Sequence, residues 1–153
     1  MSMATKQTNK YIKYAFELLE TYEAGLMLHG SEVKSIKQGH IQLKGSYIKV
    51  QANNTLWLVG AHVSPYKPAG KNHQHDPLRP KKLLLQKKEI DRLRCKLAEK
   101  GLTIVPTRVY TKGGLIKLEI GLAKGLKQHD KREKIKKRDI DRDTKRLLKE
   151  RFR

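Results

Sequence analysis

Apolar and polar residues alternate most clearly in the last third of the chain. Every second position from Ile116 to Leu122 is a branched aliphatic residue, and lysine, glutamate and glycine stand between them. A period of two predicts a strand with one buried face and one solvated face. The run before it is also strand-like, and turn-forming residues 111–114 separate the two. We therefore expect an antiparallel hairpin of Thr103–Tyr110 and Leu115–Ala123.

Two other regions carry strand patterns. Leu43–Val50 and Leu56–Val63 flank a bend of sequence Ala-Asn-Asn-Thr, which predicts a second hairpin. The second of these strands has apolar residues on both faces, so we expect burial on both. From Tyr11 to Leu28, alternation favours a long strand bent near Ala24-Gly25, and a helix stays open as the alternative.

Two segments have helical character. The stretch SEVKSIKQG begins at Ser31, a favoured N-cap, carries Glu32 in its first turn and ends at Gly39, a favoured stop. A second helix is expected over Lys87–Lys100, where positions 90, 93 and 97 form an apolar stripe. The Leu83-Leu84-Leu85 run before it fits either a short strand or the start of this helix.

Together these elements predict a mainly β fold with some α content. A small sheet of five or six strands must curl to bury its faces. A small closed antiparallel barrel of the OB-like kind is the economical solution, with two or so helices and a basic C-terminal tail. The expected division is a flexible N-terminus over residues 1–9, a body over residues 10–123 and a tail over residues 124–153.

The net charge of the chain indicates what kind of molecule it binds. The chain has 35 Lys and Arg against 15 Asp and Glu, a net charge of +20, and residues 124–153 alone hold 14 basic residues against 6 acids. Such an excess predicts a polyanionic partner. Nucleic acid is favoured over a membrane, because no basic segment has a broad apolar face and no segment is long and apolar enough to span a bilayer. The single Cys95 and an N-terminus without an apolar run fit a cytoplasmic protein.

The chemistry-bearing residues do not predict an enzyme. The sequence has neither a nucleophile-elbow serine nor a Walker phosphate loop, so we expect no catalytic residue and no cofactor. His73, His75 and Asp76 lie in the proline-rich Ser64–Pro80, but structural zinc takes four ligands, so we expect a mobile polar loop and no metal. Glu32 is a candidate acceptor for base amino groups or ribose hydroxyls. A candidate phosphate track surrounds the end of the loop: Lys71, Arg79, Lys81 and Lys82.

Four longer runs stand in a distinctive order: EAGLMLHGSEVKSIKQG at residues 23–39, HDPLRPKKLLL at 75–85, KEIDRL at 88–93 and IGLAKGLKQHDKREKIKKRD at 120–139. As a set they resemble the SmpB family, small bacterial proteins that bind transfer-messenger RNA (tmRNA, or SsrA RNA). The resemblance implies an OB-like body that binds the tRNA-like domain of tmRNA. It implies delivery to stalled ribosomes with the elongation factor that carries aminoacyl-tRNA, for trans-translation. It also implies a tail that enters the decoding region and the empty mRNA channel, against small-subunit rRNA.

The resemblance and the basic track together give the candidate residues. On the body, the RNA-binding candidates are Glu32, Lys34, Arg79, Lys81, Lys82, Leu84, Gln86, Lys124, Gly125 and Lys127. In the tail, the candidates for the decoding centre are His129, Asp130, Lys131, Arg132, Lys134, Lys136, Lys137, Arg138 and Ile140. Ile140 stands where several relatives carry Trp, so an aromatic stack there would be missing. A ribosomal protein or an OB-type single-strand binder is the alternative that composition allows.

The tail has the pattern of a weak helix. Asp130 and Glu133 have the spacing of a capping box, and Glu133–Lys137 and Asp141–Lys145 are favourable pairs four residues apart. Each pair is worth about 0.2–0.5 kcal/mol, too little to hold a helix without packing. We therefore expect the tail to be frayed in the free protein and helical against RNA.

Overall fold

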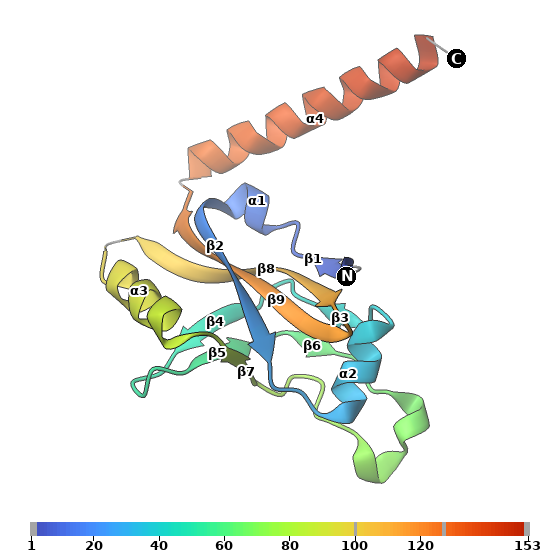
Figure 1. The fold of residues 1–153 in the computed structure, drawn as a ribbon. Coiled ribbons are helices and arrows are strands. Elements are labelled where there is room, and N and C mark those ends of the chain that lie inside the picture. Colours follow the sequence, from blue (N-terminus) through green and yellow to red (C-terminus); the bar gives the residue numbers. More distant parts are fainter. Residues whose placement is uncertain (1–2, 100, 127, 152–153) are drawn as a thin grey trace.

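One antiparallel sheet of seven strands forms most of the body (Figure 1). The computed structural model describes residues 3–99, 101–126 and 128–151, and the side chains of residues 3 and 128–130 fall outside this description. The strands are β1 Met3–Thr8, β2 Phe16–Leu26, β3 Ile41–Gln42, β4 Tyr47–Val50, β5 Leu56–Val59, β6 His62–Val63, β7 Lys81–Leu84, β8 Leu102–Lys112 and β9 Leu115–Gly125. Their order in the sheet is β1-β8-β9-β2-β7-β5-β4, and β3 and β6 pair separately.

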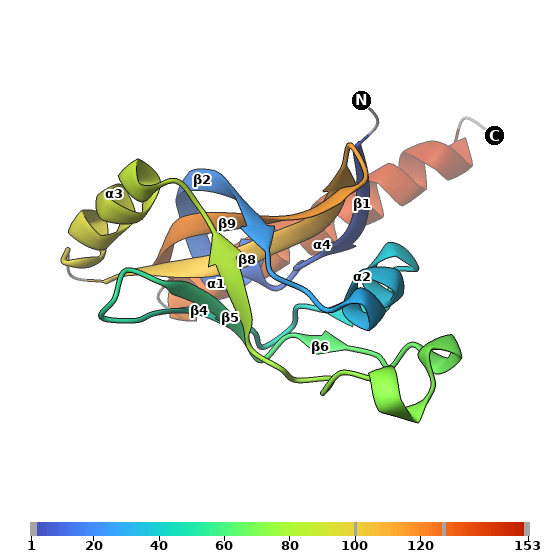
Figure 2. The same cartoon turned by 60° about the horizontal axis from the view of Figure 1, so that its bottom comes forward.

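Helices surround the sheet. The described residues form α1 Ile12–Ala15, α2 Gly30–Lys37, α3 Lys87–Leu97 and α4 Gln128–Arg151, with 3-10 turns at Lys67–Ala69 and Lys71–His73. α2 and α3 lie at opposite ends of the sheet (Figure 2). α4 extends well beyond the body (Figure 1). None of the helices in the described residues is long and apolar enough to cross a membrane.

The β8–β9 hairpin confirms the strongest pattern in the sequence. Lys112 pairs with Leu115, and the two glycines between them have φ of 58° and 80°. A two-residue hairpin turn of type I′ requires positive φ at both central residues, and glycine adopts it without steric cost. The side chains expected on the buried face are all buried: Ile116, Leu118, Ile120 and Leu122.

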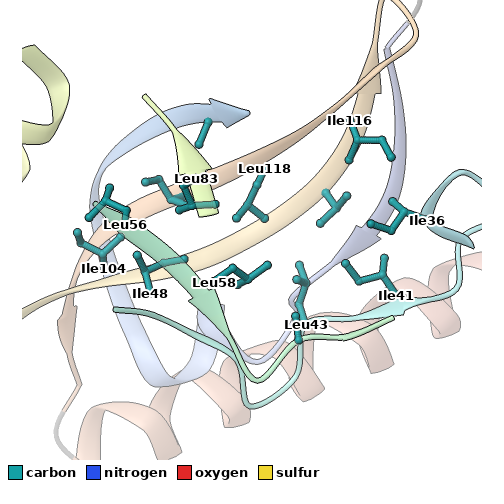
Figure 3. Close-up of a cluster of buried hydrophobic side chains, with 14 of the residues drawn as sticks. Ile36, Ile41, Leu43, Ile48, Leu56, Leu58, Leu83, Ile104, Ile116 and Leu118 are labelled. Atoms are coloured by element: carbon teal, nitrogen blue, oxygen red, sulfur yellow. The ribbon is translucent and has the colours of Figure 1, made fainter. Parts of the chain in front are cut away.

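The sheet curls but stays open, so the expected closed barrel is not confirmed. β1 pairs with β8 and β4 pairs with β5, and within the described residues neither terminal strand has a second partner. Aliphatic side chains fill the inside of the curl, where β4 packs against β8 (Figure 3). Among them are Ile36, Ile41, Leu43, Ile48, Leu58, Ile104 and Leu118. Apolar packing, not a closing ladder of hydrogen bonds, therefore joins the two sides of the curl.

The N-terminal residues differ from the sequence expectation. Residues 3–8 form β1 instead of a flexible lead-in, because their backbone groups pair with β8. Next, the buried Asn9 side chain donates to the backbone oxygens of Leu43 at 3.4 Å and Pro106 at 3.2 Å. Buried polar groups require such partners, so Asn9 ties the end of β1 to two distant segments.

The long segment after Asn9 is a strand, as expected, but begins later. Residues 12–15 form α1, whose Ile12 packs with Val105 on the face of the sheet opposite the main core. The irregularity in β2 lies between Leu18 and Glu20 and not at the expected Ala24-Gly25 bend.

Two further local expectations have clear outcomes. In β5 Leu56 and Leu58 are buried, whereas Trp57 and Val59 are half-buried, so burial on both faces does not hold along this strand. Ala61 and Val63, later in the expected strand, are buried. Leu83 and Leu84 end strand β7, Leu85 follows it, and α3 starts at Lys87. The single cysteine, Cys95, is exposed on α3.

Candidate nucleic-acid interface

A buried carboxylate organises the start of α2. Oε1 of Glu32 accepts hydrogen bonds from Arg79 Nη2 at 2.6 Å and Nε at 3.0 Å, and from the backbone N–H of His29 at 2.9 Å. Arg79 also donates to the backbone oxygen of Met27 at 3.0 Å. One arginine therefore joins the end of the 64–80 loop, the N-terminus of α2 and the end of β2.

Lys81 completes this buried network. Its side chain is fully buried, and its Nζ lies 3.5 Å from Oε2 of Glu32 and donates to the backbone oxygen of Arg79 at 2.8 Å. Burial lowers the pKa of Lys81, and the charge of Glu32 opposes that shift. Burial raises the pKa of Glu32, but the hydrogen bonds from Arg79 and His29 and the charge of Lys81 outweigh it, so the net pKa is lowered.

This geometry revises two expected RNA contacts. The side chains of Glu32 and Lys81 are both 0% exposed, so neither faces a ligand at the surface. Glu32 instead holds Arg79, which is partly exposed. The sequence singled out Glu32 as an isolated acid at a helix start, but its partner Arg79 lies 47 positions later in the chain.

His75 attaches the second half of the 64–80 loop to α2 and to β6. His75 is buried, and its Nδ1 is 2.8 Å from Ser31 Oγ while its Nε2 is 3.0 Å from the backbone oxygen of Val63. Above α2, Lys34 is exposed and its ammonium lies 5.5 Å from the ring centroid of Tyr66. His29, Lys34 and loop residues line a hollow of about 550 Å³ there.

The candidates in the KKLLLQ run adjoin this region. The backbone N–H of Met27 donates to Lys82 at 3.0 Å, and Leu84 pairs with Gly25 in β2. Leu84 is 50% exposed, and Gln86 is exposed at the start of α3. The structure thus places Arg79 and strand β7 beside the Gly25–Met27 end of β2, whereas Lys34 lies on α2 near Tyr66 and Gln86 leads into α3.

The Lys124–Gly125 candidates lie at the other end of β2. Lys124 pairs with Glu17 and Gly125 with Phe16, and both Lys124 and Gly125 are exposed. Because Phe16 and Gly25 are nine residues apart in one strand, this end lies about 30 Å from the first. Lys127 is outside the described residues.

The tail is helical over residues 128–151 and touches the body near its start. Arg138 donates to the hydroxyl of Tyr14 at 2.7 Å, and its guanidinium lies 4.6 Å from the centroid of that ring. Lys134 donates to the backbone oxygen of Lys13 at 3.5 Å. Lys131 is half-buried, and the other described tail candidates are exposed: Arg132, Lys134, Lys136, Lys137, Arg138 and Ile140. The side chains of His129 and Asp130, and with them the capping box, lie outside the described residues.

Lys13 and Tyr14 are contacts that the sequence did not indicate. Tyr14 is one of six tyrosines, and Lys13 is one lysine among many. Their importance depends on where the tail lies, and no local pattern near residues 13 and 14 encodes that.

Comparison with known proteins covers most of this chain. A family model described as "SmpB protein" matches residues 6–150. The "SsrA-binding protein" of Gloeothece citriformis is 48% identical over 92% of this chain and 90% of its own length, and that of Persephonella marina is 48% identical over 94% and 93%. A solved structure described as "tmRNA-SmpB: a journey to the center of the bacterial ribosome" superposes with a TM-score of 0.66 at 38% identity, over 84% of this chain and 93% of that one.

Proposed function

Because the chain belongs to the SmpB protein family, we propose that it binds tmRNA and acts with it in trans-translation, in which stalled ribosomes are rescued and their chains tagged. The match to the family over residues 6–150 carries this conclusion. At the finer level, it binds the tRNA-like domain of tmRNA and delivers it with the elongation factor that carries aminoacyl-tRNA. The setting is the cytoplasm, where stalled ribosomes are found.

The Gly25–Met27 end of β2 is the proposed tmRNA surface of the body. Leu84 and Gln86 are exposed next to Lys82, and the partly exposed Arg79 donates to Met27 at the end of β2. Lys34 adds an exposed cation on α2. RNA with unpaired loop bases is recognised through shape, backbone contacts and stacking, for which a fixed and basic surface is suited. Glu32 and Lys81 are buried below this surface, where they fix the position of Arg79.

The other end of the molecule is proposed to act on the ribosome. Lys124, Gly125 and Lys127 lead into the tail, whose described cations are almost all exposed. A helix of 24 residues extends about 36 Å, long enough to reach from the decoding region into an empty mRNA channel. The separation of about 30 Å along β2 supports a division of labour between a tmRNA surface and a ribosomal surface.

Recovery of RNA from a bacterial lysate tests the function. The tagged full-length protein is incubated with lysate, and bound RNA is sequenced. We expect tmRNA to be enriched far above tRNA and rRNA, and equal recovery of all three classes would reject the proposal. If six to eight phosphates are contacted, the affinity for purified tmRNA falls with salt at a log–log slope of roughly −4 to −7.

Paired alanine variants test the body surface. Replacing Leu84 and Gln86 by Ala should weaken tmRNA binding without lowering the urea midpoint, since both side chains are exposed. Leu115→Ala is the matched control, because Leu115 is 62% exposed in the β8–β9 hairpin. Equal effects of the two changes on tmRNA affinity would remove the 82–86 segment from the site.

A further inference from the structure

The outer face of strands β4, β5 and β7 carries a tryptophan that the core does not use. The three strands are neighbours at one end of the sheet (Figure 1). Leu56 and Leu58 of β5 are buried in the core, so Trp57 between them points to the opposite face. Trp57 is half-buried and is not part of the main core cluster that the described residues form. Its ring is therefore available to a partner.

Local hydrogen bonds hold the indole ring in one orientation. Its Nε1–H donates to Oγ1 of Thr55 at 3.1 Å, and the Thr55 hydroxyl donates to Oδ1 of Asn53 at 2.6 Å. Thr55 and Asn53 belong to the turn that joins β4 to β5. None of the cation–π contacts in the described part of the chain involves Trp57. The protein thus satisfies the polar edge of the ring, and a ring that is already oriented loses little freedom when a ligand stacks on it.

Two lysines flank Trp57 on the same face. The strand register places Lys49 of β4 opposite Trp57 on one side and Lys82 of β7 opposite it on the other. Neighbouring strands are about 4.8 Å apart, so both ammonium groups can reach a ligand that covers the ring. Within the described residues neither lysine forms an ion pair, and the three strands contain no acid. The face therefore suits a ligand that combines negative charge with a flat aromatic group.

A second aromatic ring lies diagonally from Trp57. Tyr47 of β4 is 52% exposed and pairs with Val59, two positions after Trp57. Diagonal neighbours of this kind are about 7–8 Å apart on one face of a sheet. Sheet proteins that bind single-stranded RNA stack two or three bases on aromatic residues of neighbouring strands. The two rings therefore give places for two successive bases.

RNA with unpaired bases fits these features better than other partners do. An unpaired nucleotide offers a base to the indole and phosphates to the lysines. A base inside a duplex is already stacked on its neighbours, so its faces are not accessible to Trp57. The cores of protein interfaces are depleted in lysine, which disfavours a protein partner. The face is also continuous with the 82–86 segment, because Leu84 follows Lys82 by two positions on the same strand.

We propose that the outer face of β4, β5 and β7 binds an unpaired segment of RNA, with one base stacked on Trp57 and the adjoining phosphates on Lys49 and Lys82. Tyr47 takes the neighbouring base. The inference deepens the proposed function and rests on it for the identity of the RNA, which is tmRNA. It adds a requirement that the proposed function does not contain: the part of tmRNA that contacts the body presents at least one unpaired base.

The fluorescence of Trp57 reports occupation of this face directly, because the chain has one tryptophan. A single-stranded oligouridine RNA is titrated into the full-length protein, and a blunt RNA duplex of the same length is the comparison. We expect saturable quenching by the single strand and little by the duplex. RNA that contacts only the tail leaves the signal unchanged, because Trp57 lies on β5 whereas α4 contacts α1. Absence of quenching, or equal quenching by the two RNAs, would overturn the proposal.

Two pairs of variants test the neighbours of the ring by the same signal. Tyr47→Leu is compared with Tyr11→Leu, because these tyrosines are 52% and 55% exposed and only Tyr47 lies on this face. Lys49→Ala is compared with Lys44→Ala, which removes an exposed lysine outside the three strands. We expect Tyr47→Leu to weaken oligouridine binding. Lys49→Ala should make the log–log salt slope shallower by about 0.7, the value for one phosphate contact on a single strand. Equal behaviour within each pair would refute the site.

Substitution of Trp57 separates stacking from apolar bulk. Trp57→Phe keeps an aromatic ring, whereas Trp57→Leu keeps an apolar side chain without one. Affinity for purified tmRNA is measured by filter binding, and thermal unfolding followed by circular dichroism shows whether each variant is folded. We expect Trp57→Leu to lose affinity about 5- to 150-fold, the range for one stacked base, and Trp57→Phe to retain most of it. Equal affinity of wild type and a folded Trp57→Leu would exclude stacking; if Trp57→Leu unfolds, the Tyr47 and Lys49 variants decide.

Three more results separate the alternatives. Uridine monophosphate that quenches Trp57 at the same nucleotide concentration as oligouridine would show a site for free nucleotides and overturn the assignment to an RNA strand. Unchanged tmRNA affinity of Trp57→Leu with loss of tagging in a reconstituted translation system would assign the face to a protein partner and overturn it as well. Quenching by oligouridine without tmRNA enrichment from lysate would reject the proposed function and leave this site standing, whereas enrichment without quenching would reject this site alone.

Discussion

Replacing Glu32 by Ala tests the role that burial gives this residue. The substitution removes the acceptor of two hydrogen bonds from Arg79 and one from the backbone of His29. It also leaves the fully buried ammonium of Lys81 without its counter-charge. Breaking a buried ion pair from one side costs about 3–5 kcal/mol, because an uncompensated charge stays behind. Since whole domains are stable by about 5–15 kcal/mol, Glu32→Ala removes a large share of the stability.

Urea unfolding followed by the fluorescence of Trp57, the single tryptophan, measures the loss. Glu17→Ala is the matched control, because Glu17 is an exposed acid on the same strand as the network's Met27 end. It should change the free energy of unfolding by less than about 0.5 kcal/mol. The double variant Glu32→Ala with Lys81→Met should recover much of the loss, because no buried charge then remains. A cost below about 1 kcal/mol for Glu32→Ala would refute the buried-network argument.

The pH dependence of the free energy of unfolding tests the same buried network, because the pKa shift of Glu32 fixes the direction of the effect. The folded pKa of Glu32 is lowered below its ordinary value of 4.5. The carboxylate therefore contributes stability that is present above that pH and is lost as pH falls through the lower folded pKa. The difference in unfolding free energy between wild type and Glu32→Gln should be constant near neutral pH and shrink on acidification below about pH 4.5. A difference that grows towards acid would contradict the direction of the shift.

Three further predictions concern the tail and the main hairpin. Truncation after Lys127 should leave tmRNA affinity nearly unchanged in a filter-binding assay and abolish tagging in a reconstituted translation system; loss of both together would make the tail part of the tmRNA clamp. A peptide of residues 130–153 should show little helix by circular dichroism in dilute buffer, because its side-chain pairs supply only about 0.2–0.5 kcal/mol each; a fully folded helix would contradict this. Gly114→Ala should lower the free energy of unfolding by about 1–2 kcal/mol, since the residue has φ of 80°, whereas Gly30→Ala, in open space at ordinary φ, should cost nothing measurable.

Local patterns predicted the elements in which the residue types themselves indicate which face is buried and where the chain turns. The β8–β9 hairpin is encoded by alternation at positions 116–122 and by two glycines in the turn. α2 is encoded by its acid in the first turn and by Gly39, which has φ of 84°. The tail helix over 128–151 follows from its pattern, and whether it frays in solution stays a prediction.

Elements defined by distant partners could not be predicted in this way. β1 exists because its backbone pairs with β8, and its polar side chains carry no sign of that. The same holds for Glu32, which looked like an exposed helix-start acid until Arg79 and Lys81 were placed beside it. The closed barrel was expected because a small sheet must curl to bury its faces. Packing of β4 on β8 buries the core without closing the sheet.

The strand order β1-β8-β9-β2 has a consequence for how the protein itself is made. Met3 pairs with Lys112 and Phe16 pairs with Gly125. The strands that are synthesised first therefore pair with strands that are synthesised nearly last. Pairing over such distances is slow, and it requires the chain to be almost complete. A nascent copy that stops before β8 has no partner for β1 and leaves the apolar side of β2 uncovered. Such a fragment stays unfolded and accessible to proteases. Interrupted synthesis of this protein therefore yields no stable, partly folded copy.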